Sequence, residues 1–256
     1  MRFYECGTEH ERTILLLAGT CCTVKSNFSK VVPLLQKHFH VIGVDYDGFD
    51  DKGTTFTTML DEVTKIEKFI QHTRNGKIDI VYGSSLGGSI AGLLVERGNL
   101  EIRHVILGSS DLDQSPNFQA HLKTSAVVNL MFPVLKTGKL PDILSKMVLK
   151  KYGEENLKLL SAMFATISTG MGNVTKTSVK NQFYSDLITP LADQISPENT
   201  FIHVFYATKM GEKYEKRYLQ HFANPDIIRQ DYGHEELLFF YPEKWVSEIL
   251  RCCGTD

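Results

Sequence analysis

The chain has 256 residues, of which 42% are hydrophobic and 23% are charged. These values are usual for a soluble globular protein that is large enough for one well-buried α/β domain. The formal net charge is −2, and no basic stripe with interleaved aromatic residues is present, so we expect no nucleic-acid partner. No apolar stretch approaches the ~18 residues of a membrane span. The N-terminus lacks the apolar core of a signal peptide, and we expect a cytoplasmic protein.

Short apolar runs alternate with amphipathic segments in the first half of the chain. Continuous apolar runs, which are typical of strands buried on both faces, cover residues 13–18, 41–44, 78–82 and 104–108. Apolar residues at helical spacing predict helices over 27–38 and 57–72, and another from Ser89 to about Arg97. This alternation predicts right-handed crossovers and a largely parallel sheet.

The alternation stops after Asp111. Residues 112–196 contain no convincing strand, and their patterns predict helices over 119–135, 142–152, 154–169 and 175–191. No linker-like composition flanks this segment. We therefore expect a helical cap inserted in the core and lying over the carboxyl edge of the sheet, in preference to a separate helical domain. The core then comprises residues 1–111 and 197–256.

The strand pattern resumes near the C-terminal end of the chain. Residues 200–207 predict a strand, 212–222 a helix and 226–229 a short last strand. A closing helix is expected over 235–251, kinked or divided at Pro242.

A hexapeptide rich in glycine and serine joins the strand over 78–82 to the helix that follows. It reads Gly83-Ser84-Ser85-Leu86-Gly87-Gly88, and a Gly-x-Ser-x-Gly sequence between a strand and a helix predicts a nucleophile elbow. The alternative is an ordinary Gly/Ser loop. In an elbow, Ser85 is the exposed nucleophile, and its hydroxyl needs a base from elsewhere in the chain.

His234 is the best candidate for that base. It follows the last predicted strand in a glycine-containing loop, and an imidazole with an ordinary pKa of about 6.5 accepts and returns a proton near neutral pH. The other eight histidines lie at helix ends, at strand starts or outside any loop at the carboxyl edge of the sheet.

The predicted elements follow one another as strand, elbow, helix, strand, helical insertion, strand, helix, strand and histidine. This order resembles that of the α/β-hydrolase family. The resemblance runs from about Thr13 to the C-terminus, and its most specific parts are the hexapeptide and Tyr232-Gly233-His234-Glu235. It implies a mostly parallel sheet flanked by helices, with a helical cap, and the chain order nucleophile, acid, histidine.

The resemblance leaves two candidates for the acid of the triad. Family members usually carry it in the loop after the strand predicted over 200–207, where Glu212 is the only carboxylate. This loop lacks the Asp of the common Gly-x-x-Asp pattern. Other members carry the acid one strand earlier, where Asp111 stands with Asp113 close by. We favour Glu212 and keep Asp111 as the alternative; Glu212 is otherwise an ordinary carboxylate at a helix N-terminus.

The resemblance also implies an oxyanion hole made of two backbone N–H groups. Leu86 follows the nucleophile and supplies one of them. Thr20, with Cys21 as second choice, supplies the other from the loop after the strand over 13–18. Family members commonly have His-Gly where this chain has Ala18-Gly19, but the contribution is a backbone donor. Cys21 and Cys22 are expected to be small buried hydrophobic residues.

We therefore predict a carboxylesterase-like serine hydrolase that cleaves a carboxylic ester or thioester through an acyl-enzyme. Acyl transfer by the same triad and a non-catalytic ligand-binding role are the alternatives. The partner is a small-molecule acyl substrate, and the oligomeric state is left open. No cofactor or metal motif is present. Several apolar residues of the predicted cap suit an acyl or aromatic group: Val127, Leu130, Met131, Phe132, Met163, Phe164 and Phe183.

Overall fold

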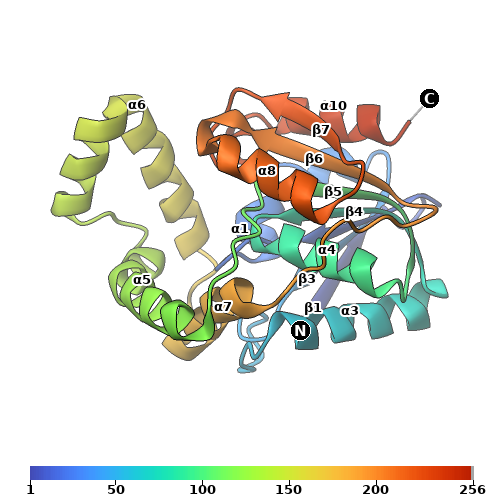
Figure 1. Cartoon of the computed structure of the whole chain (residues 1–256), viewed down its shortest axis with the longest axis horizontal. Coiled ribbons are helices and arrows are strands. Elements are labelled where there is room, and N and C mark those ends of the chain that lie inside the picture. The colour runs from blue at the N-terminus through green and yellow to red at the C-terminus, as the bar shows by residue number, and fades with distance from the viewer. Residues whose placement is uncertain (255–256) are drawn as a thin grey trace.

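A seven-stranded sheet forms the centre of the protein in the computed structural model, which describes residues 1–254 (Figure 1). The strand order is β1-β3-β2-β4-β5-β6-β7, and every neighbouring pair from β3 to β7 is parallel. The predicted mostly parallel sheet is thus confirmed. The strands are β1 (Arg2–Cys6), β2 (Thr13–Leu17), β3 (His40–Asp45), β4 (Lys77–Ser84), β5 (Glu101–Gly108), β6 (Phe201–Ala207) and β7 (Asp226–Gln230).

The strand β1 was not predicted from the sequence. It pairs with β3 in the antiparallel direction at the edge of the sheet. Its residues are exposed or half-buried, so they do not form the continuous apolar run that marks the central strands. Strand β2, by contrast, is buried along its whole length.

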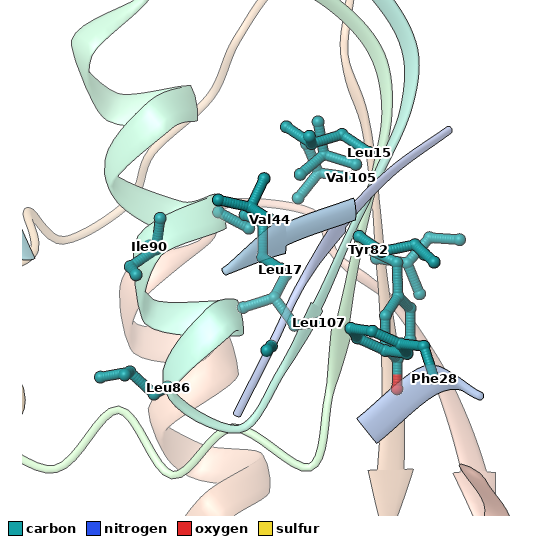
Figure 2. Packing of buried hydrophobic residues seen from close by; sticks show 14 of the residues in the cluster. Leu15, Leu17, Phe28, Val44, Tyr82, Leu86, Ile90, Val105 and Leu107 are labelled. Carbon is teal, nitrogen blue, oxygen red and sulfur yellow. The ribbon is translucent and has the colours of Figure 1, made fainter. Parts of the chain in front are cut away.

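Helices cover both faces of the sheet. Figure 2 shows Leu86 and Ile90 of α4 on one side of the strands, and Tyr82 facing Phe28 on the other. Tyr82 also meets Trp245 edge-on, with 4.7 Å between ring centroids. The helices are α1 (Val24–Phe28), α2 (Val32–Leu35), α3 (Met59–Arg74), α4 (Leu86–Arg97), α5 (Asn117–Thr137), α6 (Asp142–Ser168), α7 (Lys176–Ile188), α8 (Glu212–His221), α9 (Glu236–Phe240) and α10 (Pro242–Cys252).

Local chemistry explains where the helices differ from the prediction. The helix expected over 27–38 is two short helices, of which α1 begins at a Thr23 cap with a reciprocal Ser26 bond and α2 has Pro33 in its first turn. The closing helix is divided into α9 and α10 at Pro242, as predicted. Gly153, with φ 83°, bends α6 into two limbs at the predicted boundary.

Helices α5, α6 and α7 lie between β5 and β6 in the chain, and we call them the inserted helices. Figure 1 shows them together beyond one end of the strands, with the two limbs of α6 standing away from the sheet. Helix α7 is attached to the core through buried hydroxyls: Ser185 accepts from the Met59 N–H at 2.8 Å, and Ser178 accepts from the Phe56 N–H at 3.3 Å. Within residues 1–254, none of the helices has the length and apolar character needed to cross a bilayer.

The start of α4 touches the sheet so closely that only glycine fits. A Cβ at Gly87 would lie 2.1 Å from the Leu17 carbonyl oxygen, and one at Gly83 would lie 2.1 Å from the Gly87 carbonyl oxygen. Both obstructions are backbone atoms, which cannot rotate away. These glycines therefore allow the backbone of α4 to contact the ends of β2 and β4.

We predict that Gly87→Ala lowers the free energy of unfolding by about 1–3 kcal/mol or more, because the added methyl forces α4 away from β2. Urea unfolding followed by circular dichroism measures the loss. Gly172→Ala is the control, since a Cβ at Gly172 meets nothing within 4 Å, and its effect should stay within ~0.5 kcal/mol. Equal midpoints for the two variants would contradict the packing argument.

Candidate active site

Ser85 is the single residue between β4 and α4, and its backbone is strained. Its φ of 49° and ψ of −112° lie outside the regions that side-chain-bearing residues normally adopt. Two hydrogen bonds hold it there: the Ser85 N–H donates to the Gly108 carbonyl at 2.7 Å, and the Ser110 hydroxyl donates to the Ser85 carbonyl at 2.9 Å. The sharp strand-to-helix turn presents the side chain at the carboxyl end of β4.

His234 lies in the loop between β7 and α9, and it lines the same cavity as Ser85. His234 is an exposed residue, but the surrounding protein removes enough water to lower the pKa of its imidazole. The negative charge of Asp111 acts in the opposite direction and raises that pKa. A neutral ring at neutral pH is the form that can accept a proton.

The structure brings Asp111, and not Glu212, to this cavity. Asp111 follows β5 and lines the cavity, whereas Glu212 is the first residue of α8 and is not among the described lining residues. Arg217 of α8 holds the Asp111 segment in place: its guanidinium donates to the Asp111 carbonyl at 2.7 Å and to the Asp113 carboxylate at 2.9 Å. Of the two candidates from the sequence, Asp111 is therefore the one that lines the cavity together with His234.

The two residues expected to supply backbone N–H donors, Thr20 and Leu86, follow the neighbouring strands β2 and β4. Thr20 follows β2 and lines the cavity, and its N–H has no acceptor within residues 1–254. Leu86 is the first residue of α4, and the first N–H groups of a helix have no partner inside the helix. The Cys21 N–H donates instead to the Gln182 side chain at 2.8 Å, so Thr20 is the freer donor of the two.

The thiols of Cys21 and Cys22 are buried and line the cavity. Burial raises the pKa of Cys22 to about 12 and that of Cys21 well above its ordinary value. Both thiols are thus protonated near neutral pH and act as small hydrophobic groups, as expected. The Gln182 Nε2 atom beside them is buried and has no partner among the described residues.

A buried carboxyl group next to His234 was missed in the sequence, because Glu235 reads as the first residue of a helix. The Ser84 hydroxyl donates to Glu235 Oε2 at 2.6 Å, and the Glu235 N–H donates to the Ser109 hydroxyl at 3.0 Å. Burial raises the pKa of Glu235 to about 7, against the lowering effect of these serines. Glu235 therefore connects the histidine loop to the ends of β4 and β5.

The cavity above Ser85 measures about 560 Å³. The loops that follow the strands supply part of its polar lining, with Asn27, Lys123 and Asp186 added by helices, and the inserted helices supply most of its apolar wall. Two of the apolar residues singled out in the sequence, Leu130 and Phe132, are not among the described residues that line this cavity. The apolar lining from the inserted helices comprises Val127, Met131, Leu135, Leu160, Met163, Phe164, Ile167, Phe183 and Leu187.

Asp186 of α7 adds a second buried carboxyl group to the cavity. Burial and repulsion from Asp111 raise its pKa to about 8, while a hydrogen bond with Ser89 acts in the lowering direction. Asp186 is thus largely protonated at neutral pH. Within residues 1–254, no three His, Cys, Asp or Glu side chains converge so that they could hold a metal ion.

Comparison with known proteins confirms the resemblance noted in the sequence. Residues 12–236 match the family described as the alpha/beta hydrolase fold. A solved alpha/beta hydrolase family protein from Desulfitobacterium hafniense superimposes with a TM-score of 0.76 at 17% identity, over 99% of this chain and 100% of that one. A thermophilic esterase from Thermogutta terrifontis has a TM-score of 0.68 at 18% identity, with 99% and 94% covered.

An enol-lactonase from Burkholderia xenovorans is also similar, with a TM-score of 0.70 at 13% identity. The alignment covers 100% of this chain and 96% of the lactonase. At such identities, the likeness to each of these structures is a likeness of fold.

Glu235 is expected to make stability fall as the pH rises. Its pKa is about 7 in the folded protein and 4.5 as a model value, so between these values the folded chain keeps a proton that the unfolded chain releases. Raising the pH through this window therefore favours unfolding, by up to about 3 kcal/mol for this group. Urea titrations of the wild type at pH 5 and pH 8 should show the fall, to which Asp186 also contributes.

Glu235→Gln should reduce this fall by about 2–3 kcal/mol, because the amide has no proton to release in this range. Glu243→Gln, at an exposed position of α10, is the matched control and should retain the wild-type dependence. Parallel pH curves for the wild type and Glu235→Gln would show that Glu235 is not the titrating group.

Proposed function

Because the chain belongs to the alpha/beta hydrolase fold family, we propose that it is a serine hydrolase that cleaves a carboxylic ester or thioester. The observation that carries the proposal is the strained Ser85, which lines one cavity with His234 and Asp111. The esterase and the enol-lactonase among the similar structures act on ester bonds by their names, which supports the choice of bond.

In the acylation step, the Ser85 hydroxyl attacks the acyl carbonyl carbon and His234 takes its proton. The negative charge that develops on the carbonyl oxygen is stabilised by the N–H groups of Leu86 and Thr20. The bond from the acyl carbon to the leaving oxygen or sulfur then breaks, and the leaving group takes the proton from the His234 imidazolium. The acyl group remains on Ser85.

Water completes the reaction by the same steps. It gives a proton to His234 as it attacks the acyl-enzyme, and the second tetrahedral intermediate collapses to release the acid and restore the Ser85 hydroxyl. We assign Asp111 as the acid that orients the His234 ring and stabilises its charged form. This assignment replaces our preference for Glu212, since the charge of Asp111 acts on the ring and Arg217 anchors its loop.

The inserted helices serve in this proposal as a cap over the core formed by residues 1–111 and 197–256. Their apolar side chains face Ser85 across the cavity, so they would hold the acyl part of the substrate and keep water away from it. The volume of about 560 Å³ lies within the ordinary range for a small-molecule site.

A fluorophosphonate probe is expected to label the folded protein at Ser85, because the probe reacts with an activated serine. Ser85→Ala should abolish both labelling and ester hydrolysis. Ser84→Ala is the matched control: the Ser84 hydroxyl is buried and donates to Glu235, so this variant should still carry the probe. Undiminished labelling of Ser85→Ala, or no labelling of wild type while a known esterase reacts, would refute the proposal.

Asp111→Asn is expected to lower kcat by about 10³–10⁴ with little change in KM, because the ring of His234 loses its orienting anion. Glu212→Gln should change kcat less than about twofold, since a surface position at the start of α8 does not reach the ring. Steady-state kinetics on a p-nitrophenyl ester measure both, with unfolding midpoints as the check on folding. A large loss of kcat in Glu212→Gln, with none in Asp111→Asn, would show that Glu212 is the acid that orients His234.

A further inference from the structure

A second pocket lies beside His234, next to the large cavity. It measures about 250 Å³, which is smaller than the ~300–1,000 Å³ of a typical ligand site and suits a fragment of a substrate. Asn156, Gly233, His234 and Glu236 line part of it, and the rest of its wall is apolar: Val148, Tyr152, Leu159, Leu160, Met163 and Phe240.

The bend of α6 creates this pocket. The limb before Gly153 supplies Val148 and Tyr152, and the limb after it supplies Leu159 and Met163. The two limbs form the open angle seen in Figure 1. No side chain of the described residues fills it, and Tyr152 remains 55% exposed. The pocket therefore results from the bend in α6 and is separate from the packing of the core. We call it the α6 pocket.

Three residues line both this pocket and the cavity of Ser85: Leu160, Met163 and His234. The two spaces thus meet at the imidazole ring. In the hydrolysis of an ester, the leaving oxygen must receive its proton from that ring. The alcohol part of the substrate therefore lies toward His234, while the acyl part lies in the large cavity beside Ser85.

We propose that the α6 pocket binds the leaving group and that the substrate is an ester or thioester with an uncharged, apolar alcohol or thiol part. This inference rests on the proposed function and adds the substrate class. The apolar wall favours a short alkyl chain or a single ring. Glu236 lines the pocket and accepts a hydrogen bond from the Gly233 N–H at 2.7 Å, and its carboxylate disfavours anionic leaving groups, such as phosphate-bearing thiols.

The test compares esters that share one acyl group. Methyl butyrate and hexyl butyrate form the same butyryl-enzyme, so any difference in kcat/KM arises in binding and acylation, where the leaving group is still present. The wild type should favour the hexyl ester. Val148→Trp fills the α6 pocket without lining the Ser85 cavity, and should lower the hexyl-to-methyl ratio of kcat/KM about tenfold or more.

Met147→Trp is the matched control, because Met147 is the neighbouring residue, is 61% exposed and lines neither space. It should keep the wild-type ratio. Val127→Trp, which narrows the Ser85 cavity alone, should instead change the preference among methyl esters of longer acids. An unchanged hexyl-to-methyl ratio in Val148→Trp, with hydrolysis intact, overturns the inference and leaves the proposed function standing.

A second measurement uses the wild type and does not depend on the folding of any variant. 1-Hexanol should inhibit the hydrolysis of methyl butyrate, and 6-hydroxyhexanoate, its anionic analogue, should inhibit at least about tenfold less. Equal inhibition by the two compounds, or none by hexanol, contradicts an apolar leaving-group site. If the wild type cleaves neither ester and does not react with the fluorophosphonate probe, the proposed function fails and this inference fails with it.

Discussion

The site depends on the direct contact between the backbone of α4 and the ends of β2 and β4. Gly83 and Gly87 make this contact possible, since a methyl group at either position would lie 2.1 Å from a carbonyl oxygen. The contact puts Ser85 into its strained conformation and sets the first N–H groups of α4 beside the loop that carries Thr20. In the proposed mechanism, the nucleophile and the oxyanion donors thus result from one packing arrangement, without a separate fold element for each.

Glu235 extends that arrangement to the histidine. Its bonds with Ser84 and Ser109 connect residues far apart in the chain, the loop after β7 and the ends of two central strands. A buried carboxyl group is normally costly, and here burial keeps it half-protonated near neutral pH, so that little net charge is enclosed. The loop that carries His234 is thereby held to the elbow by hydrogen bonds in addition to apolar packing.

The sequence was sufficient for those parts of the structure that depend on local pattern. Buried parallel strands read as apolar runs, and Ser85 and His234 lie at the strand ends where the motif and the chain order place them. The edge strand β1 has no such pattern, because its residues are exposed or half-buried. The sequence offered both Glu212 and Asp111 from their loop positions but could not choose between them, since the contact of Arg217 of α8 with the Asp111 segment is not visible in the sequence. The buried position of Glu235 was not predicted, because its hydrogen-bond partner, Ser84, is distant in the sequence.

The surrounding protein shifts the pKa values of the carboxyl groups and of the histidine at this cavity in opposite directions, and both shifts favour the uncharged forms. It raises the pKa of Glu235 and Asp186 to about 7 and about 8, and it lowers the pKa of His234. These shifts favour the uncharged form of each group, whereas the negative charge of Asp111 acts on the His234 ring. In the proposed mechanism, the positive charge that forms on His234 is stabilised by the nearby Asp111, in a cavity that Asp113 and Lys123 also line. The apolar walls of this cavity and of the α6 pocket suit a substrate that is apolar on both sides of its reacting carbonyl.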